Sequence, residues 1–178
     1  MGKAPERVPD LFKNQFRAPE ACAAAGISFD ALKNLLRPDR SEVQDPAIVL
    51  SPDERIEAGA SVRYRFSFAR VMHFALTVDL LQLGFKPRRA AMLAAGYAMV
   101  GDGDRPPCHL YPTGQTFLVA VEGHDNSFIK NVQPKTKVAE FLIHSRDSAA
   151  PATVILNINH VDRRVREALG LDPDWGRS

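Results

Sequence analysis

Gly26 stands between two short segments of helical composition, and this spacing constrains the fold more than any other feature of the chain. The segment before it is rich in alanine and follows Pro19, a residue that suits the first position of a helix. After the glycine, Ser28 is a good N-cap for a second helix, which Pro38 ends. The apolar stripe of this second helix consists of Ala31, Leu32, Leu35 and Leu36. A helix, a glycine turn and a second amphipathic helix predict a helix-turn-helix.

The polar edge of the second helix suits contact with DNA. Lys33 and Arg37 can donate to guanine or to phosphate, and Asn34 can form two hydrogen bonds with adenine. The small residues of the first helix allow the two helices to cross closely, which suits the entry of the second one into a major groove. Two short helices joined at a glycine also occur in proteins that bind no DNA, so this motif alone leaves a structural role open.

Arg63 and Arg65 lie in an alternating segment that predicts a strand with two different faces. The arginines fall on one face, whereas Val62, Tyr64 and Phe66 fall on the other. A hairpin that follows a helix-turn-helix and carries arginines along its free face is typical of a wing. Wing arginines hold the phosphate backbone or enter the minor groove, and they position the protein more than they select a sequence.

Positive charge is concentrated in one part of the chain. The formal net charge is only +2, yet residues 55–89 hold seven Lys or Arg residues and only two acidic ones. A basic band inside a folded region is typical of a surface that binds nucleic acid or an acidic partner. A solvated helix face is the structural alternative.

Two longer helices are expected after the alternating strand. Ser67 can cap a helix that runs to Leu83 and ends at Gly84. Its apolar residues cover more than one stripe, so we expect most of it to be buried. His73 lies among them, where a core histidine with satisfied hydrogen bonds is expected rather than a ligand. Pro87 opens a fourth helix.

Residues 16–28 resemble the opening of MerR-type winged-helix regulators, which begin with a short strand, a helix of small residues and a glycine turn into the recognition helix. Residues 62–71 and the Leu-Gly-Phe turn at 83–85 resemble the wing exit, the next helix and the following turn of that family. The resemblance covers about residues 14–95 and implies the DNA-binding domain of a bacterial or phage-derived regulator. With the basic band, it implies DNA contacts from Arg17, Ser28, Lys33, Asn34, Arg37, Arg55, Arg63 and Arg65.

The chain differs from the MerR family at three points. The linker over residues 38–60 is long and partly acidic, and Lys33-Asn34-Leu35 stands where the family has Arg-Tyr-Tyr or Arg-Tyr-Trp. No long heptad helix follows the domain, unlike in that family. A homodimer is therefore expected because DNA-binding proteins usually recognise two half-sites, rather than from a dimerisation sequence.

The second half of the chain predicts strands followed by one helix. Strand-like runs lie at residues 117–121, 127–132, 138–144 and 153–158. Asn159 is the expected N-cap of the final helix, with Asp162 in its first turn and Gly170 after its end. Its face toward the core is expected to carry Val161, Val165, Ala168 and Leu169, and its solvent face Arg163, Arg164 and Arg166.

The fold class predicted from these elements is α+β. A winged helix-turn-helix domain is expected over residues 10–100 and a linker over residues 101–107, where glycine, aspartate and proline cluster. Residues 108–172 are expected to form a small α+β module for an effector or for dimerisation.

The sequence contains no recognisable pattern for catalysis, a cofactor or a metal. Cys22 and Cys108 are too few and too far apart for a disulfide framework or a zinc cluster, and the histidines are scattered. The longest mostly apolar run, residues 90–100, is about half of a membrane span, and the first residues lack the apolar core of a secretory signal. We therefore expect a cytoplasmic, nucleoid-associated protein that is not an enzyme and does not contact membranes.

These patterns favour a sequence-specific, DNA-binding transcriptional regulator. The expected partners are double-stranded DNA, a second copy of the chain, and RNA polymerase or another regulator bound through residues 105–178. Two alternatives stay open. One is an excisionase-like architectural protein that bends DNA with the same domain, and the other is a protein-interaction module whose helix-turn-helix binds no DNA.

Overall fold

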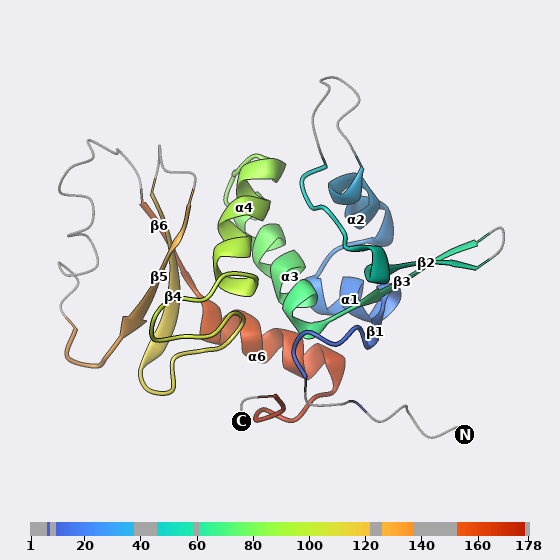
Figure 1. Ribbon diagram of the computed structural model, residues 1–178. Coiled ribbons are helices and arrows are strands. Elements are labelled where there is room, and N and C mark those ends of the chain that lie inside the picture. Colours follow the sequence, from blue (N-terminus) through green and yellow to red (C-terminus); the bar gives the residue numbers. More distant parts are fainter. Residues whose placement is uncertain are drawn as a thin grey trace.

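The computed structural model describes residues 7, 10–37, 46–58, 61–121, 126–136 and 153–176. These residues form an α+β fold with two small antiparallel sheets at opposite ends of a group of helices (Figure 1). The predicted fold class is therefore confirmed. The first sheet belongs to the N-terminal half of the chain and the second to the C-terminal half.

The N-terminal half begins with two short helices, as the sequence predicts. β1 (Phe16–Arg17) leads directly into α1 (Ala18–Ala25), and α2 (Phe29–Leu36) follows after a short turn. Gly26 ends α1 in the left-handed conformation with φ of 70°, which glycine adopts without a steric penalty. The Ser28 hydroxyl caps α2 by accepting from the backbone N–H of Ala31.

The first sheet has the order β1-β3-β2 and projects a hairpin from the molecule (Figure 1). β3 (Ser61–Phe66) occupies the expected segment, and its partner β2 (Arg55–Ala58) follows a short 3₁₀ turn, η1 (Pro52–Glu54). β2 was not predicted: Arg55-Ile56-Glu57-Ala58 does alternate between charged and apolar residues, but four residues are the shortest run that indicates a strand. At the base of the hairpin, β1 pairs with the end of β3 and places Phe16 opposite Phe66.

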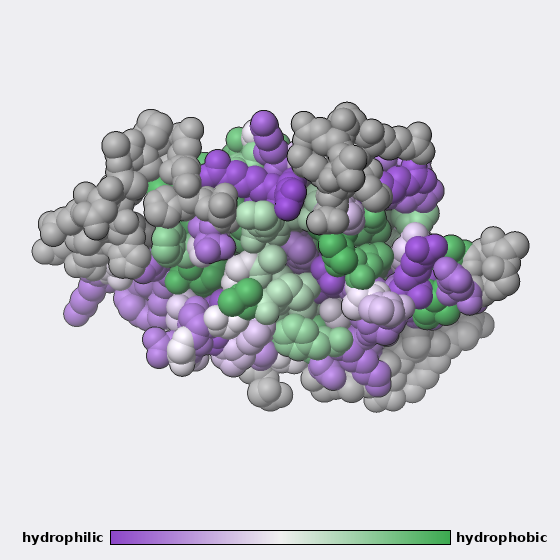
Figure 2. All heavy atoms as spheres, turned by 45° about the horizontal axis from the view of Figure 1, so that its top comes forward, coloured by the Kyte–Doolittle hydropathy of each residue, from purple (hydrophilic) through white to green (hydrophobic). Residues whose placement is uncertain are grey.

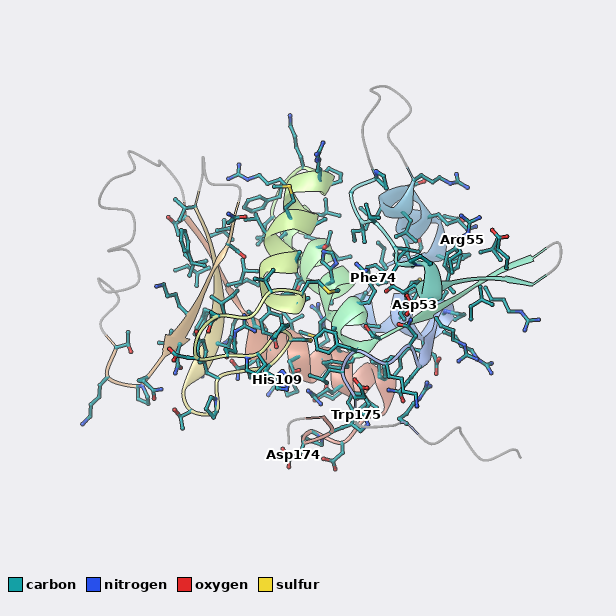
Figure 3. All side chains as sticks on the ribbon, viewed as in Figure 1. Asp53, Arg55, Phe74, His109, Asp174 and Trp175 are labelled. Atoms are coloured by element: carbon teal, nitrogen blue, oxygen red, sulfur yellow. The ribbon has the colours of Figure 1, made fainter. Side chains whose placement is uncertain are left out.

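α3 (Phe68–Gln82) and α4 (Pro87–Ala98) form the centre of the molecule. The Ser67 hydroxyl caps α3 by accepting from the backbone N–H of Arg70, as predicted. α3 is buried around most of its circumference because α1, α4 and α6 all pack against it. Phe74 extends from α3 toward the first sheet, and its ring meets that of Phe66 edge to face at 5.0 Å (Figure 3).

The second sheet has the order β5-β4-β6, from β4 (Gln115–Val121), β5 (Phe128–Val132) and β6 (Thr153–Asn157). These strands confirm three of the four runs expected there, and the fourth, residues 138–144, lies outside the described residues. β6 runs directly into α6 (Ile158–Leu169), which ends at Gly170 as predicted.

The expected cap of α6 was wrong by two residues. The Asn157 side chain accepts from the backbone N–H of His160 and is the N-cap. Asn159 instead accepts from the backbone N–H of Thr116 at 2.6 Å, so its side chain joins α6 to β4. A tertiary hydrogen bond thus uses the asparagine that the local sequence favoured as a cap.

The expected solvent face of α6 was also partly wrong. Arg166 is only 3% exposed, donates to Asp162 at 2.8 Å and lies over the ring of Phe68. Arg164 donates to both carboxylate oxygens of Asp79 on α3, at 2.9 and 3.0 Å. Only Arg163 is exposed. Arg166 thus pairs with a carboxylate one turn earlier on α6, and Arg164 pairs with a carboxylate on α3, so two of the three arginines have acidic partners.

One hydrophobic core joins the two halves of the chain. It includes Leu32 from α2, Phe68 from α3, Leu118 from β4 and Val161 from α6. α6 runs beneath the helices from the second sheet toward β1, and it packs on both α1 and α3 (Figure 1). The division into residues 10–100 and 108–172 stays a prediction about organisation, but the two parts share this core.

The segment expected as a linker, residues 101–107, packs firmly on α4 through Arg105. This side chain is 2% exposed and donates to backbone carbonyls of Tyr97, Val100, Pro106 and His109. A guanidinium with this many carbonyl acceptors fixes the local chain path. The segment behaves as a structured turn rather than as a free connection.

Candidate nucleic-acid interface

The exposed edge of α2 carries the residues expected to read bases. Asn34 and Arg37 are exposed, and the described residues supply no hydrogen-bond partner for either side chain. Lys33 is half-buried, 3.3 Å from the carboxylate of Asp30 and 4.4 Å from the centre of the Phe29 ring. Asn34 and Arg37 are thus available to a ligand, whereas Lys33 must first leave two neighbours.

Ser28 has a structural role that competes with DNA contact. Its hydroxyl accepts from the backbone N–H of Ala31 at 3.1 Å, which satisfies one of the free N–H groups at the start of α2. The opposite side of α2 is held by the buried Leu32 and Leu35, and the carbonyl of Leu35 accepts from Ile48. The exposed edge is therefore presented by a helix that is anchored along its length.

Three arginines gather on the first sheet. Arg17 on β1 lies directly opposite Arg65 on β3 in antiparallel register, and alternation puts Arg63 on the same face. No carboxylate among the described residues forms an ion pair with any of the three. The guanidinium of Arg65 donates to the backbone carbonyl of Gln15 at a long 3.4 Å. Like charges directly opposite each other destabilise an antiparallel pair, so a bound anion would stabilise this cluster.

Arg55 does not belong to that cluster. It lies on β2 opposite Tyr64, so it occupies the other face of the sheet, and its guanidinium is 3.4 Å from the carboxylate of Glu57. Asp53 and Arg55 lie together at the base of the hairpin (Figure 3). Of the eight residues expected to contact DNA, Arg55 is thus the one that the sheet turns away from the other arginines.

A hollow of about 370 Å³ lies where α1, α2 and the first sheet meet. Its lining consists of Arg17, Ala18, Pro19, Phe29, Val62, Arg63, Tyr64 and Arg65. The rings of Phe29 and Tyr64 meet edge to face at 6.1 Å, which joins the start of α2 to β3. The hollow brings three of the expected residues together, whereas Asn34, Arg37 and Arg55 lie outside its lining.

Sequence reasoning missed the aromatic part of this hollow. Phe29 is the first residue of α2 and lies outside the leucine stripe, and Tyr64 was expected only as an inward-facing strand residue. The available signal was an aromatic residue, Phe29, at the polar start of α2. It lies outside the stripe of leucines that packs into the core, so it needs a different packing partner. Its partner could not be identified without the strand register.

The structure divides the basic band of residues 55–89 into two groups. Arg70 forms a bidentate pair with Glu54, at 2.6 and 2.9 Å, and Arg89 donates to the carbonyl of Val121. Lys86 and Arg88 are exposed at the start of α4. Figure 2 shows hydrophilic side chains projecting above α4 and others over the hairpin. Part of the band therefore stabilises the fold, and the rest adds positive charge to the surface.

His73 is a core residue, as expected. Its Nε2 donates to the carbonyl of Ala91 at 2.8 Å, and its Nδ1 accepts from Arg70 at 3.2 Å, which assigns the neutral tautomer. Burial lowers the pKa of His73 to about 4, and the nearby Arg70 charge adds to that effect. Burial likewise raises the pKa of the Cys108 thiol well above its usual range. These groups are suited to structure rather than to chemistry near neutral pH.

Within the described ranges, no three His, Cys, Asp or Glu side chains are arranged to hold a metal ion. None of the helices there is long and apolar enough to cross a membrane. No model of a known protein family matches the sequence, and no curated protein is similar to it at a level that shows a relationship. The MerR resemblance therefore rests on the residues quoted above, and the site is argued from its geometry.

Proposed function

We propose that the protein is a sequence-specific, DNA-binding transcriptional regulator with a MerR-like winged helix-turn-helix. In this proposal α2 is the recognition helix and the hairpin of β2 and β3 is the wing. The observation that carries it is the position of two chemically different parts on neighbouring elements. In the described part of the chain, α2 exposes the amide of Asn34 and the guanidinium of Arg37, and the start of α2 meets the sheet that carries Arg17, Arg63 and Arg65.

The two parts suit the two kinds of contact that specific binding needs. Asn34 can bond adenine through two hydrogen bonds, and Arg37 can bond guanine or a phosphate. Arg17, Arg63 and Arg65 provide positive charge for phosphates, which supplies affinity without sequence information. Phe29 and Tyr64 hold the start of α2 against β3, so the two kinds of contact keep a fixed spacing.

Lys33 and Ser28 are assigned smaller roles. Lys33 already contacts Asp30 and the Phe29 ring, and it must leave both to reach DNA. Its contact with DNA therefore adds less free energy of binding than that of an unpaired lysine. Ser28 caps α2 and orients it. Arg55, paired with Glu57 on the opposite face, contributes through the general field of the hairpin rather than through the arginine cluster.

The C-terminal half is proposed as the part that links DNA binding to a partner. α6 contacts α1 and α3 directly, so a change at the second sheet can reach the DNA-binding elements through packed helices. A homodimer is proposed because specific recognition usually uses two half-sites. Contact with RNA polymerase or another regulator through residues 105–178 is proposed because α6 connects this half of the chain to α1 and α3.

The test is selection of sheared genomic DNA by the full chain at about physiological salt, followed by sequencing of the retained fragments. That salt concentration suppresses most binding through phosphates alone. Enrichment of a defined site by the unmodified protein, lost with Asn34→Ala/Arg37→Ala and kept with Arg163→Ala, supports the proposal. Arg163 is the matched control because it is exposed on α6, on a different element.

Other outcomes identify the alternatives. Inverted half-sites about one helical turn apart indicate a dimer on DNA. Direct adjacent repeats together with a large bend, measured by the mobility of circularly permuted fragments, indicate an excisionase-like architectural protein. Retention that shows no enriched site and falls smoothly with salt contradicts specific binding, and it leaves the protein-interaction module.

A further inference from the structure

The hollow between α2 and the first sheet has two kinds of lining. Arg63 and Arg65 line it from one face of β3 and Val62 and Tyr64 from the other, so the hollow lies at the edge of β3 where the pairing with β1 stops. Arg17 adds a third cation, and Ala18, Pro19 and Phe29 add apolar surface. None of these eight residues carries a carboxylate. The combination is that of small-molecule pockets, which are mostly apolar and contain a few polar groups that fix orientation. Its volume of about 370 Å³ lies in the range typical of such pockets.

The apolar part of the hollow is left in contact with water. Phe29 is 39% exposed and Val62 is 42% exposed, although both carry large apolar side chains. A DNA phosphate bound to the arginines would neutralise their charge but would not cover these side chains. A ligand that satisfies both parts needs an anionic group and an apolar body.

The arrangement of the two parts selects the shape of that ligand. The opposed Arg17 and Arg65 present donors from neighbouring strands, a geometry that suits the oxygens of a carboxylate, sulfonate or phosphate ester. The rings of Phe29 and Tyr64 are at 67° to each other, so they form a corner rather than a slot. A flat ring system can stack on one of them and meet the edge of the other.

We propose that this hollow binds a small organic anion whose body is a flat apolar ring system. The anionic group lies on Arg17 and Arg65, with Arg63 adding charge, and the rings lie against Phe29 and Tyr64. A ligand there occupies the same surface as the proposed DNA contacts, so it competes with DNA. Binding itself does not depend on DNA, whereas the competition rests on the function proposed above.

The experiment uses 1-anilinonaphthalene-8-sulfonate as the probe, because it joins a sulfonate to a flat naphthalene ring system and its fluorescence rises on binding. The full chain is titrated with this dye, with the neutral N-phenyl-1-naphthylamine and with inorganic sulfate. We expect saturable binding of the anionic dye at one site per chain. The neutral dye and sulfate alone are expected to bind at least about tenfold more weakly, because each lacks one part of the ligand.

Three variants test where the dye binds. Arg17→Gln/Arg65→Gln and Phe29→Ala are each expected to weaken binding by about tenfold or more. Lys86→Gln/Arg88→Gln is the matched control, because it removes the same number of exposed cations from the start of α4. Circular dichroism checks that every variant is folded. An equal loss in the control, or equal binding of the neutral dye, overturns the proposal.

Competition is tested with a DNA fragment recovered from the genomic selection. Displacement of the dye from its site by that fragment supports regulation by direct competition. A ternary complex in which both remain bound overturns the competition. If the selection enriches no DNA but the dye binds as expected, the ligand site stands and the proposed DNA-binding function is the part that fails.

Discussion

The arginines around α6 and the arginines of the first sheet are used in opposite ways. Beside α6, Arg166 is buried and donates to Asp162, and Arg164 donates to Asp79 on α3. On the first sheet, Arg17 and Arg65 lie opposite each other, and no carboxylate of the described residues pairs with either. The same side chain thus joins elements in one region and directs positive charge toward solvent in the other.

This difference separates structural charge from charge that is available to a ligand. Taking an arginine out of water is costly unless a carboxylate and good hydrogen bonds compensate, and the α6 region provides both. Arginines placed opposite each other on a sheet repel, and an external anion relieves that repulsion. The paired arginines therefore stabilise the fold, and the unpaired arginines of the first sheet are the ones available to bind an anion.

The largest effect is expected from breaking the buried pair on α6. Asp162 has no exposed surface and Arg166 is 3% exposed, so Asp162→Ala leaves a buried guanidinium without its carboxylate. We expect the free energy of unfolding to fall by about 3–5 kcal/mol, measured by denaturant titration. Glu57→Ala, which removes the partner of the exposed Arg55, is expected to cost less than about 1 kcal/mol.

A double substitution sharpens this comparison. Asp162→Leu/Arg166→Met replaces both charges by apolar side chains, so it is expected to lose much less stability than Asp162→Ala. Equal losses in the single and double variants would show that packing around α6, rather than the unpaired charge, causes the effect.

The next effect is a loss of stability in acid, carried by His73 beside the Arg70–Glu54 pair. Its pKa is about 4 in the fold and near its ordinary value of 6.5 in the unfolded chain. The unfolded state therefore binds more protons between these pH values, and stability falls as the pH decreases from about 6.5 toward 4. The contribution is roughly 3 kcal/mol at most, at about 1.4 kcal/mol per pH unit.

The measurement is the free energy of unfolding at several pH values across that window. His73→Leu cannot take up the proton, so its stability curve is expected to be flatter than that of the unmodified protein even if it is less stable at neutral pH. Parallel curves for the two proteins would assign the acid sensitivity to groups other than His73.

Local signals predicted most of the helices of this fold. Gly26, Ser28 and Ser67 perform the capping roles that their positions suggest, because caps depend on residues only a few positions apart. Asn159 failed as a cap because Thr116, far away in the chain, provides a donor for its side chain. Contacts of that kind leave no trace in local sequence.

The candidate site could be predicted in its charge but not in its shape. Alternation along β3 correctly put Arg63 and Arg65 on one face. It could not show that β1 adds Arg17 opposite Arg65, or that Phe29 meets Tyr64, since both depend on register and packing between elements. The α6 arginines show the converse error. Asp162 lies four residues before Arg166 and could have been paired with it from the sequence, whereas only the tertiary structure relates Asp79 to Arg164.

A moderate effect on DNA is expected from Asn34→Ala. The side chain is exposed, so the substitution should leave stability unchanged while it weakens binding to the selected site by about 1–3 kcal/mol. Binding to random DNA of equal length should not change, because phosphate contacts do not involve this amide. Both affinities are measured by fluorescence anisotropy at one salt concentration. Equal losses on the two DNAs would contradict the assignment of α2 as the helix that reads bases.

The smallest effect distinguishes paired from unpaired arginines within the hairpin itself. Arg63→Ala removes a guanidinium that no carboxylate of the described residues pairs with, so binding to every DNA should weaken and the slope of log affinity against log salt should become shallower by about 1. Arg55→Ala/Glu57→Ala removes an ion pair with no net charge and should leave that slope unchanged. Affinity measured over a series of salt concentrations tests both variants. If the two variants change the slope equally, the position of an arginine on the hairpin, and not the absence of a carboxylate partner, decides whether it contacts phosphate. The division between structural and available arginines would then not hold for the wing.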